Sequence, residues 1–210
     1  AIRQYHLHAA VLLFVLLFGG TAYLATQSVG YGTVDPEAVA FGLTGLGMFL
    51  VPLVAVAFAQ GIVVEMRTRG DLKLLLGMPF SRRDVVLGSF AGRVVLVCAA
   101  VLAGVGAATL LALVRGAPVA FDTLLAATGL VCVLGVVFVA LAVAISASVS
   151  TTTRSGAIAM GVYFLFAFDL WRQVPRVVLY VLNGFRFPQQ APRWVDFVAH
   201  LNPVLAFRDA

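Results

Sequence analysis

Charged side chains are scarce in this sequence of 210 residues, in which Asp, Glu, Lys and Arg together make up 11%. A soluble domain has about 25% charged and about 45–50% apolar residues. This chain is instead 62% hydrophobic, with a mean hydropathy of +1.05. So little charge cannot cover a water-exposed surface, which excludes a soluble enzyme, a disordered tail and a secreted disulfide-bonded module. The composition predicts a polytopic membrane protein.

Metal-binding and catalytic motifs are missing as well. The two cysteines, Cys98 and Cys132, lie in apolar runs without a metal-type spacing, and His6, His8 and His200 show no such spacing either. The sequence has no Walker A loop, no HExxH, no GxSxG and no pair of acidic residues within an apolar run. We therefore expect no catalytic residue, no metal and no bound cofactor in this chain, and we expect ATP to bind elsewhere.

Basic residues account for the net charge of +5, and they gather between apolar runs instead of spreading over one face. This distribution argues against a nucleic-acid partner. Residues 65–93 are rich in Arg and Lys, whereas residues 27–38 contain neither. The positive-inside rule then places the N-terminus and residues 65–93 in the cytoplasm. The arginines of the tail fall on the outer side in this topology, against the rule, which has less weight for long connections.

Apolar runs long enough to cross about 30 Å of hydrocarbon recur along the chain. Five spans are predicted, at about residues 8–26, 39–64, 94–114, 123–146 and 156–171. The predicted fold is an all-α transmembrane bundle that forms a single transmembrane domain over residues 1–210. The fifth span meets Asp169 and Trp171, so it is either a short span that ends at the interface or a longer one kinked at Pro175. Pro52 in the second span is a candidate gate, although such kinks are common in purely structural membrane helices.

The tail, residues 172–210, is predicted to be an outer amphipathic or re-entrant segment. Apolar residues recur there at helical spacing, which is typical of a helix that lies in the membrane interface. They are Trp194, Phe197, Val198 and Leu201. Asn202 and Pro203 should end this helix, and the apolar residues 204–207 read as the approach to another span.

The segment 65–93 contains two helical patterns. Residues 71–76 form a short amphipathic run that is closed by Pro79, which cannot continue a helix. Ser81 precedes Asp84 by three residues, a capping-box spacing that predicts a helix continuing into the third span. Such a segment suits docking to another protein. It is equally explained as a solvated basic loop that only sets the topology.

This segment resembles the first cytoplasmic loop of type-2 ABC transporter permeases. The matching residues are Glu65, Gly70, Lys73, Leu75, Leu76, Pro79, Ser81, Arg82 and Gly88. Asp71 stands where Ser or Thr is common in that family, and Ser89 stands where Lys is usual. The small polar stretch 146–150 and the Leu-Asn-Pro at residues 201–203 support the resemblance over most of the chain.

The resemblance implies a six-span permease whose sixth span follows Ala210, in the cell membrane, with export as the direction of transport. Two permease subunits, as a homo- or heterodimer, would pair with two separate ATP-binding subunits that hold ATP and Mg²⁺. Residues 70–84 would form the coupling helix that docks on the ATPase, with Arg82 and Arg83 pairing with acidic groups there. The coupling residues would be Glu65, Arg69, Gly70, Asp71, Lys73, Pro79, Ser81, Arg82, Arg83 and Asp84.

Other interpretations stay open at this point. Gly88 and Gly92 permit close helix approach, either between subunits or within the chain. A non-transporting scaffold or assembly subunit that recruits a cytoplasmic partner or anionic lipid would also use a basic loop. A secondary transporter is less favoured, because midplane polar groups are not found. Permeases of the resembled family serve drugs, polysaccharides or the maturation of copper enzymes such as nitrous-oxide reductase, and no residue here selects among these substrates.

Overall fold

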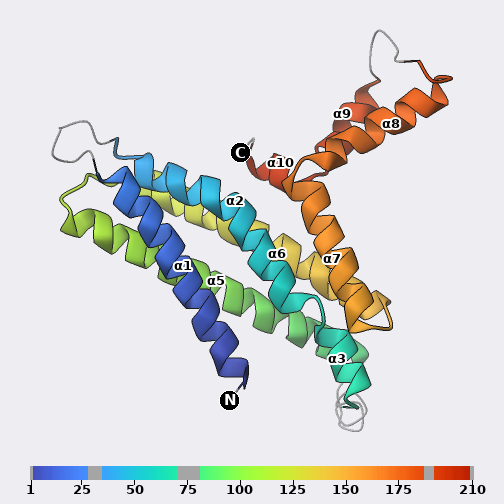
Figure 1. Cartoon of the computed structure of the whole chain (residues 1–210), viewed down its shortest axis with the longest axis horizontal. Coiled ribbons are helices and arrows are strands. Elements are labelled where there is room, and N and C mark those ends of the chain that lie inside the picture. The colour runs from blue at the N-terminus through green and yellow to red at the C-terminus, as the bar shows by residue number, and fades with distance from the viewer. Residues whose placement is uncertain (1, 28–34, 71–80, 187–191, 209–210) are drawn as a thin grey trace.

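The structure is a computed structural model that describes residues 2–27, 35–70, 81–186 and 192–208. Every regular element among these residues is a helix (Figure 1). The helices are α1 (Ile2–Ala25), α2 (Ala38–Ala59), α3 (Ile62–Thr68), α5 (Arg82–Val114), α6 (Phe121–Ser148), α7 (Thr152–Ala167), the 3-10 turn η2 (Leu170–Arg172), α8 (Gln173–Leu182), α9 (Arg193–Ala199) and α10 (Pro203–Arg208). The predicted all-α helical fold is confirmed.

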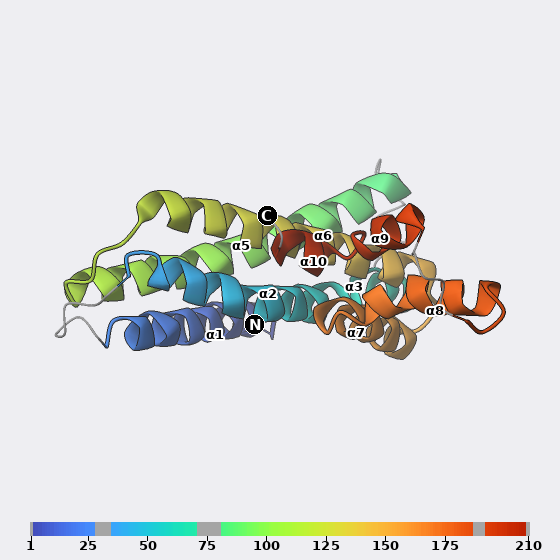
Figure 2. The ribbon, with the colours of Figure 1, turned by 90° about the horizontal axis from the view of Figure 1, so that it is seen from above.

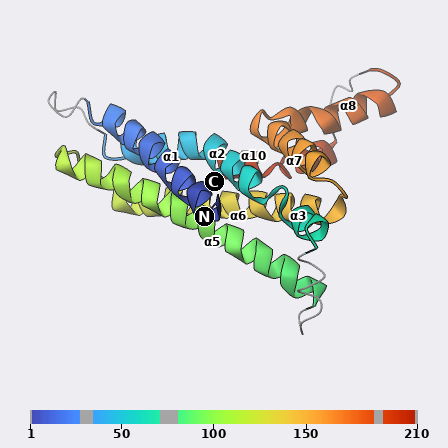
Figure 3. The same ribbon diagram turned by 60° about the horizontal axis from the view of Figure 1, so that its bottom comes forward.

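Four long helices form the bundle. α1 packs along α5, α2 packs along α6, and α5 also contacts α6 and α2 (Figures 1 and 2). α7 lies against α2 and α6. One end of the bundle contains α3, the start of α5 and the α6–α7 junction; we call it the basic end, after Arg67, Arg69, Arg82, Arg83 and Arg154 (Figure 3).

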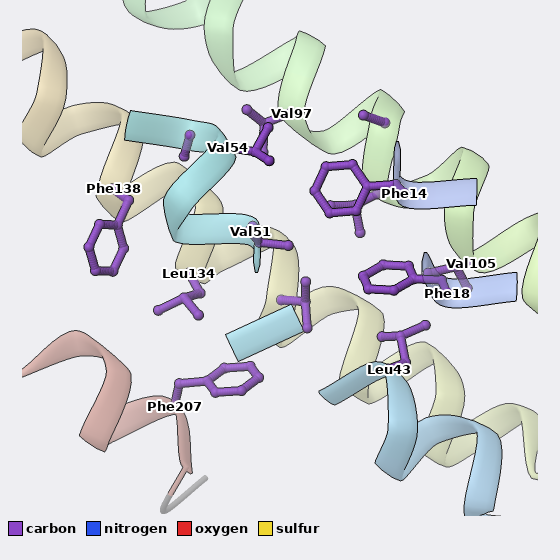
Figure 4. Close-up of a cluster of buried hydrophobic side chains, with 14 of the residues drawn as sticks. Phe14, Phe18, Leu43, Val51, Val54, Val97, Val105, Leu134, Phe138 and Phe207 are labelled. Atoms are coloured by element: carbon purple, nitrogen blue, oxygen red, sulfur yellow. The ribbon is translucent and has the colours of Figure 1, made fainter. Parts of the chain in front are cut away.

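Large side chains from several helices fill the core of the bundle (Figure 4). The rings of Phe14 and Phe18 on α1 are fully buried, and their centroids lie 5.3 Å apart. They pack toward α5, while Phe138 on α6 lies on the other side of α2. Gly104 of α5 allows this packing: a Cβ built there would lie 2.9 Å from Cδ2 of Phe18 and 3.0 Å from the carbonyl oxygen of Phe14. α1 and α5 therefore cross almost backbone to backbone at this glycine.

Within the part of the chain that the structure describes, three helices pass a test of length and apolar composition for crossing a membrane: Ala38–Thr68, which joins α2 and α3, Arg82–Val114 and Phe121–Ser148. These correspond to the second, third and fourth predicted spans. The 33 residues of α5 would extend roughly 50 Å at about 1.5 Å per residue, well beyond the hydrocarbon core. α5 thus begins 12 residues before the predicted span at Val94, as the capping-box spacing had indicated.

The first predicted span corresponds to α1, which is 24 residues long. The fifth predicted span is less regular. The fifth span is broken: α7 and the following helix, counted from Leu170 to Leu182, meet at an angle of 78°. The bend lies at Asp169, whose φ of 55° is left-handed. The alternative of a kink at Pro175 is therefore wrong, because this proline lies in the first turn of α8, where a proline needs no N–H partner.

Beyond the bend, α8 and α9 pack on each other and on η2, and α10 returns to the bundle (Figure 1). α9 covers most of the predicted amphipathic run and ends before Asn202, as predicted. The buried residues of α9 are Val195 and Ala199, on a different face from the predicted apolar stripe. The stripe itself faces away from the protein, with Trp194 39% and Phe197 68% exposed. α10 buries three apolar side chains, and it packs on α6, α7 and α2.

Candidate coupling site at the basic end

The segment 65–93 begins in α3 and ends in α5. Glu65 and Arg69 form an exposed ion pair one turn apart, with 3.6 Å between Oε2 and Nη2. Such a pair contributes little stability. Gly70 follows α3 with a φ of +83°, a left-handed conformation that glycine tolerates and that ends helices. Three predicted coupling residues, Asp71, Lys73 and Pro79, lie outside the described residues, as does the short helix expected at 71–76.

Ser81 and Asp84 form the capping box that their spacing predicted. The Ser81 hydroxyl accepts from the Asp84 N–H at 3.3 Å, and the Asp84 carboxylate accepts from the Ser81 N–H at 2.8 Å. These hydrogen bonds from Ser81 lower the pKa of the Asp84 carboxyl below its ordinary value. Both residues are exposed and precede the apolar part of α5. The box fixes the position at which the chain re-enters a helix.

A spin label tests this cap. In Ser81→Ala, labelled at Arg83→Cys after Cys98 and Cys132 are replaced by alanine, the label should become more mobile, because the first turn loses its acceptor. The lowered pKa means that the carboxylate's contribution is complete above pH of about 4 and is lost as the pH falls through the folded pKa. In unmutated Ser81 protein, mobility should therefore rise only below that range. Equal mobility in Ser81→Ala and unmutated protein at pH 7 would contradict the cap.

Arg82 and Arg83 occupy the first turn of α5 and are exposed. Cations at a helix N-terminus oppose the helix dipole, which costs about 0.3–1 kcal/mol each. The stability of α5 therefore does not explain their position. They stand at the end of the basic segment, with their guanidinium groups available to an acidic surface.

A second arrangement at the basic end ties α3 to α6. α3 begins after Gly61, which has no side chain to cap the helix. The hydroxyl of Ser146, on α6, accepts instead from the N–H groups of Val63 and Val64 at 3.1 and 3.3 Å. Ser146 is fully buried. One serine more than eighty positions away in the sequence thus satisfies the free amides of α3.

Arg67 of α3 in turn caps the C-terminal end of α6. Its Nη1 donates to the carbonyl oxygen of Val149 at 3.1 Å, and its Nη2 donates to that of Ala147 at 3.2 Å. A guanidinium at a helix C-terminus satisfies free carbonyls and suits the dipole. α3 and α6 therefore cap each other.

The start of α7 completes the contact. The Thr151 hydroxyl caps α7 by accepting a hydrogen bond from the N–H of Arg154 at 3.4 Å. Ser155, fully buried, donates its hydroxyl to the carbonyl oxygen of Gln60 at the end of α2. We call Arg67, Ser146 and Ser155, with the backbone groups that they bond, the α3 joint. The sequence shows the small polar stretch 146–150, but its role in bonding α3 was not predicted. The available signal was a polar residue near the end of each of α3, α6 and α7.

The remaining predicted residues lie apart from this joint. Pro52 is buried inside α2. A Cβ at Gly88 or Gly92 would have nothing within 4 Å among the described residues, and both glycines are exposed. Packing within the described part of the chain thus gives them no role. Gly47 behaves differently, since a Cβ there would lie 3.1 Å from Val131 of α6.

Polar groups also gather at the bend at Asp169. The Asp169 carboxylate pairs with Arg172 at 3.2 Å. Asn202, 1% exposed, donates to the carbonyl oxygen of Phe166 at 3.1 Å and accepts from the N–H of Val204 at 3.0 Å. These bonds hold α10 against the end of α7. No cluster of three or more His, Cys, Asp or Glu that could bind a metal occurs in the described part of the chain.

An apolar helical bundle with basic residues gathered at one end is the architecture of a polytopic membrane protein. The profile of the family described as ABC-2 family transporter protein matches residues 1–210. Two relatives, each described as a probable ABC transporter permease protein NosY, are 33% identical to this chain. The one from Pseudomonas aeruginosa aligns over 214 positions and the one from Stutzerimonas stutzeri over 217, each covering 99% of this chain and 75% of the relative. The chain belongs to the ABC-2 transporter family and is a multi-pass membrane permease subunit.

Proposed function

We propose that this permease subunit exports its substrate, using ATP that a separate subunit hydrolyses after docking on residues 65–93. The observation that carries the proposal is the position of Arg82 and Arg83, exposed in the first turn of α5 where they do not stabilise that helix. An acidic cleft on an ATPase would give these cations their partner. The ATP and Mg²⁺ would belong to that subunit.

The proposal includes an orientation. The basic end and the N-terminus lie on the cytoplasmic side of the cell membrane, which agrees with the Arg and Lys excess of residues 65–93. A cytoplasmic ATPase then reaches α3 and α5 directly. A second permease subunit would complete the transporter, and the exposed faces of Gly88 and Gly92 leave room for it.

The substrate class is left open by this proposal. The relatives' name identifies them as probable permeases and states no substrate. The scaffold alternative requires only that the basic segment recruit a partner, and it predicts no effect of nucleotide. Family membership as a permease favours transport over this alternative.

A pull-down tests the docking. The tagged chain is purified from its native membrane in mild detergent, and co-purifying proteins are identified by mass spectrometry. Arg82→Ala/Arg83→Ala should reduce recovery of a P-loop ATPase subunit at least tenfold, because two charged contacts are lost. Arg186→Ala/Arg193→Ala, which removes two exposed arginines from the tail, is the matched control and should retain it. Failure of any ATPase to accompany the unmutated chain would overturn the proposal.

A further inference from the structure

We propose that the α3 joint transmits movement of the 65–93 segment to α6 and α7, with Ser146 and Arg67 as its positioning residues. This inference rests on the proposed function, since it assumes that an ATPase pulls on that segment. It adds the route by which the pull reaches the membrane helices. A conformational change needs a rigid element held by contacts at both of its ends.

The bonding of α3 determines which helices it would move. α3 follows α2 in the chain, but the two helices are separated at Gln60 and Gly61. The side-chain bonds of α3 instead run to α6, through Ser146 and Arg67. α3 also contacts α5 and α7. A displacement of α3 is therefore carried directly to α6 by these side-chain bonds, in addition to the chain connection through Gln60 and Gly61 to α2.

Gln60 lies where α7 meets the end of α2. Ser155 of α7 donates its hydroxyl to the Gln60 carbonyl oxygen. The Gln60 side chain lies beside Gly156 of α7, with Oε1 3.2 Å from where a Cβ would stand. α7 is thereby bonded to the chain immediately before α3, so a displacement of α3 also reaches α7.

The route continues to the other side of the bundle. α7 leads into the 78° bend at Asp169 and so into α8. α10 packs on both α6 and α7 and is held to the end of α7 by Asn202. Movement of α6 and α7 therefore reaches α8 and α10, the elements farthest from the basic segment along this path. The joint connects the docking segment to the outer elements without passing through α1.

Distances between spin labels test the joint in the complete complex of permease and ATPase, reconstituted in nanodiscs. Cys98 and Cys132 are replaced by alanine, and labelled copies are diluted with unlabelled ones. One label pair, Thr68→Cys with Leu24→Cys, reports on α3. A second pair, Val177→Cys with Leu24→Cys, reports on α8; all three positions are exposed. With the joint intact, ATP and vanadate should shift both distances.

Breaking the joint should separate the two responses. In Ser146→Ala, or in Arg67→Ala, the shift at Thr68 should remain while the shift at Val177 falls by at least half. Ser146→Thr and Arg67→Lys, which keep an acceptor and a donor, should restore part of it. Ser148→Ala is the matched control, since its exposed hydroxyl bonds only its own helix at Ala144 among the described residues. A merely stabilising role would not separate the two label pairs.

The outcomes distinguish this inference from the proposed function. An unchanged Val177 shift in both joint variants overturns the joint while leaving ATPase docking intact. Loss of the ATPase from the unmutated complex overturns the proposed function itself. Should buried Ser146→Ala fail to fold, Arg67→Ala decides the question, because Arg67 is exposed and its removal opens no cavity.

Discussion

Gly104→Ala is expected to destabilise the bundle by about 1–3 kcal/mol, the range for an added methyl group in a packed core. The new Cβ would stand 3.0 Å from the Phe14 carbonyl oxygen and 2.9 Å from Cδ2 of Phe18. A ring edge can turn aside, but a backbone carbonyl moves only if α1 moves. α1 must therefore retreat from α5 along their whole contact. Thermal unfolding of the purified protein in detergent should show a lower midpoint, and Gly104→Leu should prevent the monodisperse protein from being recovered.

Gly106 provides the control on the same helix. It lies two residues away, is exposed, and has nothing within 4 Å of a built Cβ among the described residues. Gly106→Ala should leave the midpoint unchanged or raise it slightly, since alanine favours a helix over glycine by about 1 kcal/mol. Equal midpoints for the two alanine variants would mean that α1 and α5 do not cross at Gly104.

Much of this fold can be predicted from the sequence, because membrane helices follow simple rules. Apolar runs of sufficient length gave the positions of α2, α5 and α6, since backbone groups in lipid must be bonded within the helix. The start of α5 was predicted to the residue, because Ser81 and Asp84 bond only their own turn. Local chemistry of this kind depends on residues three apart, which a sequence displays directly.

The bend and the joint could not be predicted in the same way. Asp169 takes a left-handed conformation that no local pattern demands, whereas the visible breaker, Pro175, fits easily in the first turn of α8. Ser146 bonds the amides of α3 from another helix. A lone serine near the end of an apolar run looks like any small residue until the packing of α3 on α6 is known. What failed was the prediction of long-range pairing, which depends on tertiary contacts.

The bend at Asp169 and the α3 joint have one physical property in common. In both places a helix ends inside the protein, where its free backbone groups find no water. Buried polar groups must then be bonded by side chains from elsewhere. Ser146 does this for α3, and Asn202 does it for the end of α7 and the start of α10. Each polar residue thereby fixes the relative position of two helices.

Asn202→Ala is accordingly expected to destabilise the protein by about 1–3 kcal/mol, the range for leaving buried groups unsatisfied. The carbonyl oxygen of Phe166 loses its donor from the side chain, and the N–H of Val204 loses the acceptor that caps α10. α10 should then detach from α7, although Val204 and Phe207 are buried apolar residues that oppose this. Limited proteolysis of the purified protein should show faster cleavage after Arg208, together with a lower unfolding midpoint.

Asn183→Ala is the matched control for this effect. Asn183 also donates from its side-chain amide to a backbone carbonyl, that of Arg186 at 3.0 Å, but it is exposed and water can replace the bond. Exposed hydrogen bonds contribute little because the unfolded chain makes equal ones with water. The Asn183 variant should therefore keep its midpoint and its cleavage rate. If instead both asparagines prove equally dispensable, burial of Asn202 does not hold α10 in place, and the apolar contacts of α10 with α6 and α2 must suffice to position it.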